Sequence, residues 1–185
     1  MSTIAKPATI KDLERFPGKA ELINGRIVEY MPTGFRRNRI AFLICKILDE
    51  YAAETGIGVV LTDNIGFRVR RLSSGRESFS PDAAYYHGPL PKNEMKFLPG
   101  PPTLAVEVRS EGDYSSLADI EMAAKRADYF EAGTLVVWDV DVMENCINIY
   151  RASQPDQPTR CGIDDMVDAE PAMPGWKVAV RSILG

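Results

Sequence analysis

The feature of this sequence that most limits its fold is a helical segment between two short apolar runs. The runs are Thr103–Val108 and Leu135–Val140, and both consist mainly of residues that favour strands. The stretch between them, Tyr114–Glu131, is predicted to be helical and to stop at Gly133. A strand, a helix and a second strand in this order predict a crossover unit, in which two parallel strands share a sheet and the helix covers one face.

The rest of the chain predicts a hairpin, a long helix and several short strands. Asn24-Gly25 lies at the centre of Ala20–Tyr30, and both residues tolerate positive φ, which favours a two-residue turn. Apolar residues at spacings of three and four predict a helix over Asn38–Glu54. The other expected elements are a short helix at Ile10–Phe16, a loop at Gly88–Pro102, and strands at Gly58–Leu61, Gly66–Arg71, Asp82–Tyr86, Cys146–Tyr150, Thr159–Ile163 and within Pro174–Leu184. We therefore predict a single α/β domain over residues 1–185, with a mixed β-sheet flanked by helices and an N-terminal β-hairpin.

The scarcity of histidine and cysteine restricts the metals that this chain can bind. It has one histidine, His87, and three cysteines without close spacing, which excludes a zinc-type or histidine-rich site. A bound metal would be held mainly by carboxylates, which favours Mg²⁺ or Mn²⁺. No apolar run reaches the roughly 18 to 20 residues of a membrane span, and Met1–Pro17 lacks the apolar core of a secretory signal. We expect a cytoplasmic protein that has no membrane partner.

Two carboxylates stand in segments that otherwise consist of core residues. Glu107 interrupts the apolar run Leu104–Val108, where an ionised group is costly unless a cation or hydrogen bonds compensate it. The alternative for Glu107 is an exposed edge strand. Asp82 follows Ser80-Pro81 and begins a strand, although an aspartate in this position also caps turns. Acids on consecutive strands are able to meet across a sheet and chelate one hard cation, with Glu21 of the hairpin as a third acid.

Lys125 is the candidate cation beside these acids. On its helix it shares a face with Met122 and Tyr129, three residues before it and four after, so we expect the stem of the lysine to be covered. The alternative is an exposed pair with Glu121 at i,i+4, which would contribute little to stability. The first interpretation makes Lys125 part of a site, and the second makes it a surface residue.

The distribution of positive charge is local. The net charge of −4 gives the whole chain no attraction for nucleic acid. Two basic clusters are present, and each is either solvated surface or a binding site for phosphates. The first cluster is Arg36, Arg37 and Arg39, and the second is Arg68, Arg70, Arg71 and Arg76.

Several segments, taken in order, resemble a known family. They are Glu21–Glu29, Ser80-Pro81-Asp82, Leu104–Ser110, Lys125–Tyr129 before Gly133, Val136–Val140, and Met173–Trp176. Each motif alone is weak, but their order and spacing over roughly Ile10–Leu184 resemble the putative restriction endonuclease family, a widespread bacterial group related to the PD-(D/E)XK nucleases.

This resemblance implies a restriction-endonuclease-like core in which Asp82 and Glu107 are metal ligands and Glu21 is an accessory acid. The related nucleases carry a lysine two residues after the second acid, where this chain has Arg109. In the resembled family the lysine comes instead from the following helix, where Lys125 lies. Arginine keeps its proton at usable pH, so Arg109 could stabilise a phosphate but could not act as a base.

Together these expectations describe a Mg²⁺- or Mn²⁺-dependent endonuclease. Lys125 would position the attacking water, and the expected partner is nucleic acid, with DNA favoured. The arginines expected to hold backbone phosphates are Arg36, Arg37, Arg39, Arg68, Arg70 and Arg109. A homodimer would suit double-strand cleavage, but no sequence signal indicates one. The alternatives are an inactive nucleic-acid- or partner-binding module on the same fold and a hydrolase of a smaller phosphate ester.

Overall fold

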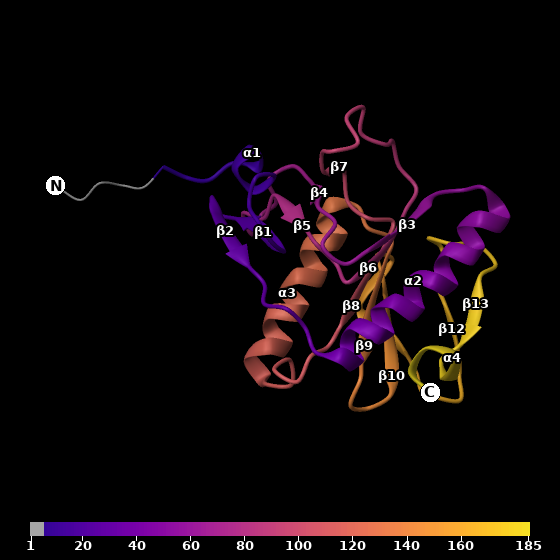
Figure 1. Ribbon diagram of the computed structural model, residues 1–185. Helices are drawn as coiled ribbons and strands as arrows, with labels where there is room; N and C mark the ends of the chain where they lie inside the picture. The colour runs from indigo at the N-terminus through magenta and orange to yellow at the C-terminus, as the bar shows by residue number, and fades with distance from the viewer. Residues whose placement is uncertain (1–5) are drawn as a thin grey trace.

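The computed structural model describes residues 6–185 and has a six-stranded mixed sheet as its central layer (Figure 1). From one edge to the other, the strands are β11 (Gln154–Cys161), β10 (Cys146–Arg151), β9 (Val136–Asp141), β8 (Leu104–Val108), β6 (Ala83–Tyr86) and β3 (Val59–Thr62). β8 and β9 are parallel, and the other neighbouring pairs of this sheet are antiparallel. This arrangement confirms the predicted α/β class with a mixed sheet.

Two helices cover opposite faces of the sheet. α2 (Phe35–Thr55) contributes Ile44 to the core on one face, and α3 (Ser116–Ala132) contributes Tyr129 to the core on the other. Alternate residues of β8 enter the two cores, because successive side chains of a strand point to opposite faces. A strand that is covered on both sides explains why Leu104–Val108 is apolar at almost every position.

The predicted crossover unit is present as β8, α3 and β9. α3 begins after Ser115, whose hydroxyl oxygen accepts a hydrogen bond from the backbone N–H of Ala118, and it ends at Gly133, with φ of 112°. The parallel register places Glu107 opposite Asp139. Glu107 therefore lies on a central strand, and the exposed edge strand considered as an alternative is excluded.

The N-terminal hairpin is also confirmed. β1 (Ala20–Ile23) pairs with β2 (Arg26–Glu29), and the turn residues Asn24 and Gly25 have φ of 51° and 68°. The remaining strands form two small sheets. These contain β5 (Ser78–Phe79), β4 (Phe67–Arg68) and β7 (Leu98–Pro99), and β12 (Met166–Asp168) with β13 (Lys177–Ala179).

Several predicted boundaries were wrong. The strand expected at Gly66–Arg71 is only two residues long, because its partners β5 and β7 each offer two residues. β7 also lies inside the segment predicted to be a loop, Gly88–Pro102. β11 begins at Gln154, before the expected Thr159, because pairing with β10 rather than an apolar pattern defines this exposed edge. The sequence analysis missed β5 and β12.

The helices are α2, α3 and two short ones, α1 (Ile10–Leu13) and α4 (Arg181–Leu184). α2 begins three residues earlier than predicted, and α1 stops before the predicted Phe16. Between residues 6 and 185, none of these helices is both long enough and apolar enough to cross a membrane.

Candidate active site

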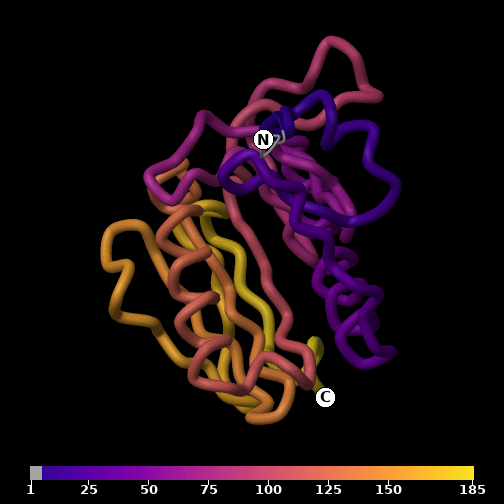
Figure 2. The backbone as a smooth tube through the Cα atoms, turned by 90° about the vertical axis from the view of Figure 1, so that its left-hand side faces the viewer, coloured from indigo at the N-terminus to yellow at the C-terminus, as the bar shows by residue number. Residues whose placement is uncertain are grey.

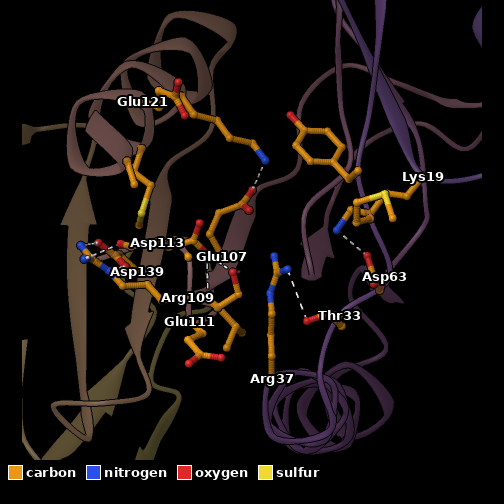
Figure 3. Close-up of a pocket in the computed structure, with 18 of the residues that line it drawn as sticks. Lys19, Thr33, Arg37, Asp63, Glu107, Arg109, Glu111, Asp113, Glu121 and Asp139 are labelled. Atoms are coloured by element: carbon orange, nitrogen blue, oxygen red, sulfur yellow. Dashed lines mark hydrogen bonds and ion pairs between the residues drawn. The ribbon is translucent and has the colours of Figure 1, made fainter. Parts of the chain in front are cut away.

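A cleft of about 1430 Å³ opens between the α2 side and the α3 side of the molecule. One wall contains the end of β2, the loop 30–34 and the start of α2, and the opposite wall contains the end of β8, the loop 109–114 and α3. Figure 2 shows these two sides of the backbone lying apart, and Figure 3 shows side chains that line the space. Of the four residues predicted for the site, Glu107 and Lys125 line this cleft, and Asp82 and Glu21 lie behind its lining.

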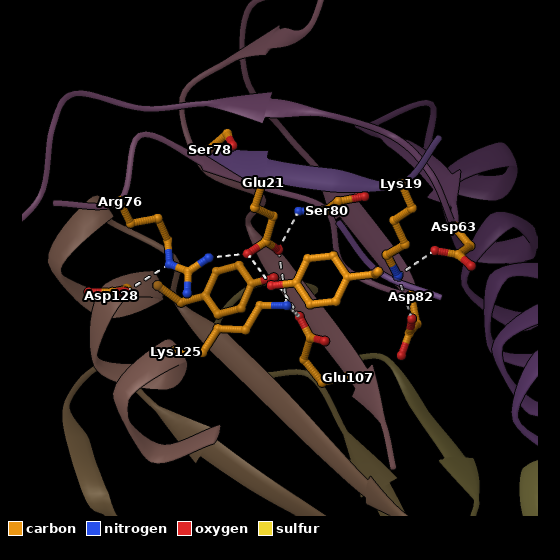
Figure 4. A network of polar contacts seen from close by, with 12 residues as sticks. Lys19, Glu21, Asp63, Arg76, Ser78, Ser80, Asp82, Glu107, Lys125 and Asp128 are labelled. Atoms are coloured by element: carbon orange, nitrogen blue, oxygen red, sulfur yellow. Dashed lines mark hydrogen bonds and ion pairs between the residues drawn. The ribbon is translucent and has the colours of Figure 1, made fainter. Parts of the chain in front are cut away.

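Glu107 and Lys125 meet inside the cleft. Lys125 Nζ lies 2.8 Å from Glu107 Oε1, and the hydroxyl of Tyr129 donates a 2.6 Å hydrogen bond to the same oxygen. Lys125 Nζ also lies 3.1 Å from Glu21 Oε1 (Figure 4). The ammonium group therefore pairs with two acids from distant segments, and the alternative of a surface pair with Glu121 does not apply.

Glu21 is completely buried and accepts hydrogen bonds and ion pairs at both oxygens. Oε2 receives the hydroxyl of Tyr30 at 2.9 Å and the guanidinium of Arg76, while Oε1 receives the backbone N–H of Ser80 at 2.9 Å and pairs with Lys125. These four donors already surround the carboxylate that the resemblance suggested as an accessory metal ligand. The geometry instead makes Glu21 an anchor for the Lys125 ammonium group.

Arg76 extends this network to α3. Its Nε donates a 2.8 Å hydrogen bond to Asp128 Oδ2, and its guanidinium lies 5.3 Å from the centre of the Phe79 ring. The arginine is 7% exposed, so it belongs neither to a solvated surface nor to a set of accessible phosphate contacts. This corrects the expectation for its cluster: Arg76 holds the hairpin acid and α3 together.

Asp82 is 3% exposed and joins β6 to β8. Its Oδ2 accepts a 2.8 Å hydrogen bond from the backbone N–H of Val108, directly after Glu107. Lys19 Nζ lies 2.8 Å from Oδ1, and Arg37 Nη2 lies 3.1 Å from Oδ1 and 2.9 Å from Oδ2. Asp82 is therefore part of an ion cluster that bridges strands, and the alternative of a simple turn cap does not describe it.

Arg109 is turned away from Glu107. Its guanidinium makes two hydrogen bonds to Asp139, of 2.9 Å and 2.8 Å (Figure 3), and a 3.0 Å hydrogen bond to Asp119. Asp139 lies within β9 and is 1% exposed, so this ion pair compensates its charge. Arg109 thus stabilises the crossover unit in this structure.

The other predicted phosphate-binding arginines lie in different places. Arg36 and Arg37 line the cleft, and Arg36 donates a 2.8 Å hydrogen bond to Asn145, in the turn between β9 and β10. Arg39, Arg68 and Arg70 are exposed and do not line it. Only part of the predicted basic set is therefore brought to the site.

Burial and neighbouring charge affect the site residues differently. Burial raises the pKa of Glu107, and the nearby charges of Asp82 and Glu21 add to this effect against the opposing ammonium of Lys125. Burial alone would lower the pKa of Lys125, but Glu107 and Glu21 outweigh it and raise the pKa. Lys125 therefore stays protonated at neutral pH, which suits charge stabilisation rather than proton abstraction.

The acids at the cleft suit a hard divalent cation. No group of three or more His, Cys, Asp or Glu side chains in residues 6–185 is arranged to hold a metal ion. Mg²⁺, however, keeps several waters and is usually held by one or two carboxylates. Glu107 supplies such an oxygen, because both of its described polar contacts are made through Oε1, which leaves Oε2 to a ligand. Asp82 would supply one where a cation that it now binds, Lys19 or Arg37, gives way. This donor set fits Mg²⁺ or Mn²⁺.

Lys19 and Asp63 were not predicted as site residues. Lys19 Nζ bridges Asp63 Oδ1 at 2.6 Å and Asp82 Oδ1 at 2.8 Å. The spacing of two between Lys19 and Glu21 at a strand start was a usable signal, because it places both on one face. Asp63 follows β3 and carried no such signal.

Arg109→Lys tests whether restoring the lysine of the related nucleases helps this site. We expect no gain in cleavage, because the side chain points to Asp139, and a loss of about 1–3 kcal/mol in the free energy of unfolding, because lysine cannot make the bidentate contact. Urea unfolding and a cleavage assay measure both effects. Arg160→Lys, in an exposed pair with Glu144, is the control and should change neither. Faster cleavage by Arg109→Lys would contradict this assignment.

The fold and the site define a class of protein. The central mixed sheet carries Glu107 on β8 and Asp82 directly before β6, and Lys125 of the crossover helix lies between Glu107 and Glu21. The model of the Uma2 family, described as putative restriction endonucleases, matches residues 10–181. The chain belongs to this family, which confirms the resemblance found in the sequence and supports a nuclease.

One solved structure agrees with this membership. A putative nuclease belonging to DUF820 from Anabaena variabilis has a TM-score of 0.73 and 18% sequence identity, over 96% of this chain and 98% of that chain. At this identity the likeness shows the fold. No curated protein matches the sequence.

Proposed function

We propose that this chain is a Mg²⁺- or Mn²⁺-dependent endonuclease that hydrolyses phosphodiester bonds of nucleic acid, with DNA as the favoured substrate. The observation that carries the proposal is the position of Lys125 Nζ, 2.8 Å from Glu107 and 3.1 Å from Glu21, in a cleft that Glu107 also lines. Three segments far apart in the chain converge to make this arrangement. A buried ammonium group beside acids that suit a hard cation is appropriate for a reaction that builds negative charge on phosphate oxygens.

Each residue has a distinct part in the proposed reaction. Asp82 and Glu107 would hold the divalent ion, which when bound lowers the pKa of its water and polarises the phosphoryl group. Lys125 orients the attacking water and stabilises charge on the phosphate. Glu21 is a positioning residue, because its four donors include the Lys125 ammonium group.

The cleft walls would hold the substrate. Arg36 and Arg37 both line the α2 side; Arg37 is held by Asp82, whereas Arg36 is exposed and is placed to contact backbone phosphates, which position a nucleic acid without reading its sequence. Cleavage of both strands of a duplex would need two copies of the chain or two successive binding events.

Lys125→Met is the direct test of this proposal. Methionine keeps the apolar stem beside Tyr129 but removes the charge, so we expect cleavage of plasmid DNA with Mn²⁺ to fall by about 10²- to 10³-fold. Binding of Mn²⁺, measured by calorimetry, should persist because both proposed ligands remain. Lys125→Arg, which retains the charge, separates loss of charge from loss of packing and should recover part of the activity.

Lys92→Met is the matched control, because Lys92 is exposed in the loop before β7 and should leave cleavage unchanged. Small phosphate esters and RNA are assayed beside DNA. Equal cleavage by the native protein and Lys125→Met would remove Lys125 from the mechanism. Hydrolysis of a small phosphate ester without cleavage of any nucleic acid would show that the substrate is a small ester and not a nucleic acid.

A further inference from the structure

Asp82 carries two positively charged neighbours in addition to its backbone contact. Lys19 Nζ is 2.8 Å from Oδ1, and Arg37 Nη2 reaches both oxygens. With the N–H of Val108 on Oδ2, each oxygen of this carboxylate is engaged; Figure 4 shows Lys19 between Asp82 and Asp63. The two acids of the site therefore differ, because the described polar contacts of Glu107 fall on one oxygen only.

Lys19 is placed to leave Asp82 without losing a partner. It precedes β1, lines the cleft and also contacts Asp63 Oδ1 at 2.6 Å. The Asp63 side chain is 33% exposed, whereas that of Asp82 is 3% exposed. If the ammonium moved off Asp82, it would keep a carboxylate neighbour and come closer to solvent, so no unpaired buried charge would result.

Arg37 is less able to move in this way. It contacts both oxygens of Asp82, and its Nε is buried without a hydrogen-bond partner in the described part of the chain. Its other polar contact is a 3.4 Å hydrogen bond to Thr33. Of the two cations on Asp82, Lys19 has the stronger alternative partner and is the one that can exchange.

We propose that Lys19 is the internal counter-ion of Asp82, that a divalent cation must displace it to bind, and that the displaced ammonium group then contacts a substrate phosphate. This inference rests on the proposed function of the same site. It assigns Lys19 two opposing effects: competition with the metal in the free protein, and attraction for the phosphate once the metal is bound.

Calorimetric titration of the full chain with MnCl₂ tests the first effect. Lys19→Met should bind Mn²⁺ about tenfold more tightly than the native protein, the lower end of the effect that one close unit charge has on the binding of a proton. Lys46→Met removes an equal charge from an exposed position of α2 and should leave the affinity unchanged. Lys19→Gln repeats the measurement if the methionine variant does not fold.

Binding of a fluorescent phosphorothioate DNA duplex at saturating Mn²⁺ tests the second effect. Here Lys19→Met should bind several-fold more weakly than the native protein, since one phosphate contact is lost. Lys19→Met must therefore raise the affinity for Mn²⁺ and lower the affinity for the duplex. An unchanged or weaker Mn²⁺ affinity, or an unchanged duplex affinity, would overturn the proposal.

Glu107→Gln in the same titrations separates this inference from the proposed function. If Glu107→Gln and the native protein bind Mn²⁺ equally, the metal site itself is wrong. If Glu107→Gln loses Mn²⁺ while Lys19→Met binds it as the native protein does, the metal site stands and only the role of Lys19 fails.

Discussion

Glu107→Gln is expected to abolish detectable cleavage and weaken Mn²⁺ binding by at least about 100-fold while the fold stays intact. Removal of an outer hydrogen-bond partner of a metal ligand already lowers affinity by about 10- to 100-fold, so loss of a ligand charge should exceed this. Calorimetry with MnCl₂ and a plasmid cleavage assay measure the two losses. Glutamine has the shape of glutamate, which confines the change to charge and hydrogen bonding.

The free energy of unfolding of Glu107→Gln tests whether Glu107 also stabilises the fold. Burial and the charges of Asp82 and Glu21 raise the pKa of Glu107, so the ionised carboxylate is less favourable in the folded protein than in the unfolded chain. At neutral pH, neutralising it should therefore leave the free energy of unfolding unchanged or raise it. That result would assign Glu107 to ligand binding and not to stability.

Glu111→Gln is the matched control, because Glu111 is exposed and lines the same cleft. It should retain both Mn²⁺ binding and cleavage. Marked destabilisation by Glu107→Gln would mean that Glu107 is structural, and native activity in this variant would end the metal-site proposal.

Glu21→Gln is expected to act on stability, unlike Glu107→Gln. It should lower the free energy of unfolding by about 3–5 kcal/mol, which is the usual effect of removing one partner of a buried ion pair. The positive charges of Arg76 and Lys125 would lose their shared carboxylate, and an amide cannot accept all four donors. Because a small domain is stable by roughly 5–15 kcal/mol, this loss should be visible as a large shift in the urea midpoint.

The pH dependence of this loss has a defined sign. Burial opposes ionisation of Glu21, but Lys125, Arg76 and the hydrogen bonds outweigh it and lower the pKa from the ordinary value of 4.5. A group with a lowered folded-state pKa contributes stability above its unfolded-state pKa and loses this contribution as the pH falls through its folded-state pKa. The difference between the native protein and Glu21→Gln should be full near pH 7 and shrink below about pH 4.5.

Glu29→Gln, on the other strand of the same hairpin, is the control, because Glu29 is exposed. It should unfold as the native protein does at every pH. A deficit in Glu21→Gln that stays constant down to acid pH would show that packing, and not the ionised carboxylate, stabilises this part of the molecule.

The sequence by itself determined the first hairpin, the long helix and the crossover unit, and it singled out the acids that we propose for the site. The NG turn of the first hairpin, the periodicity of α2 and the β8–α3–β9 crossover depend on local properties: tolerance of positive φ, spacing of apolar residues, and helix caps. Glu107 was visible because it interrupts an apolar run, and a carboxylate in such a run needs compensation wherever the chain places it.

Only the tertiary structure decided how the charges are shared. The oxygens of Glu21 accept from four donors, which belong to Arg76, Tyr30, Ser80 and Lys125. Because these donors come from segments that are distant in the sequence, the sequence does not predict how many of them reach Glu21. Arg109 was expected to hold a backbone phosphate and Arg76 was placed in a basic cluster, but both are bound to buried aspartates. The physical reason is that the partner of a charged side chain is set by distance in space, which local sequence patterns do not encode over the 52 residues that separate Arg76 from Asp128.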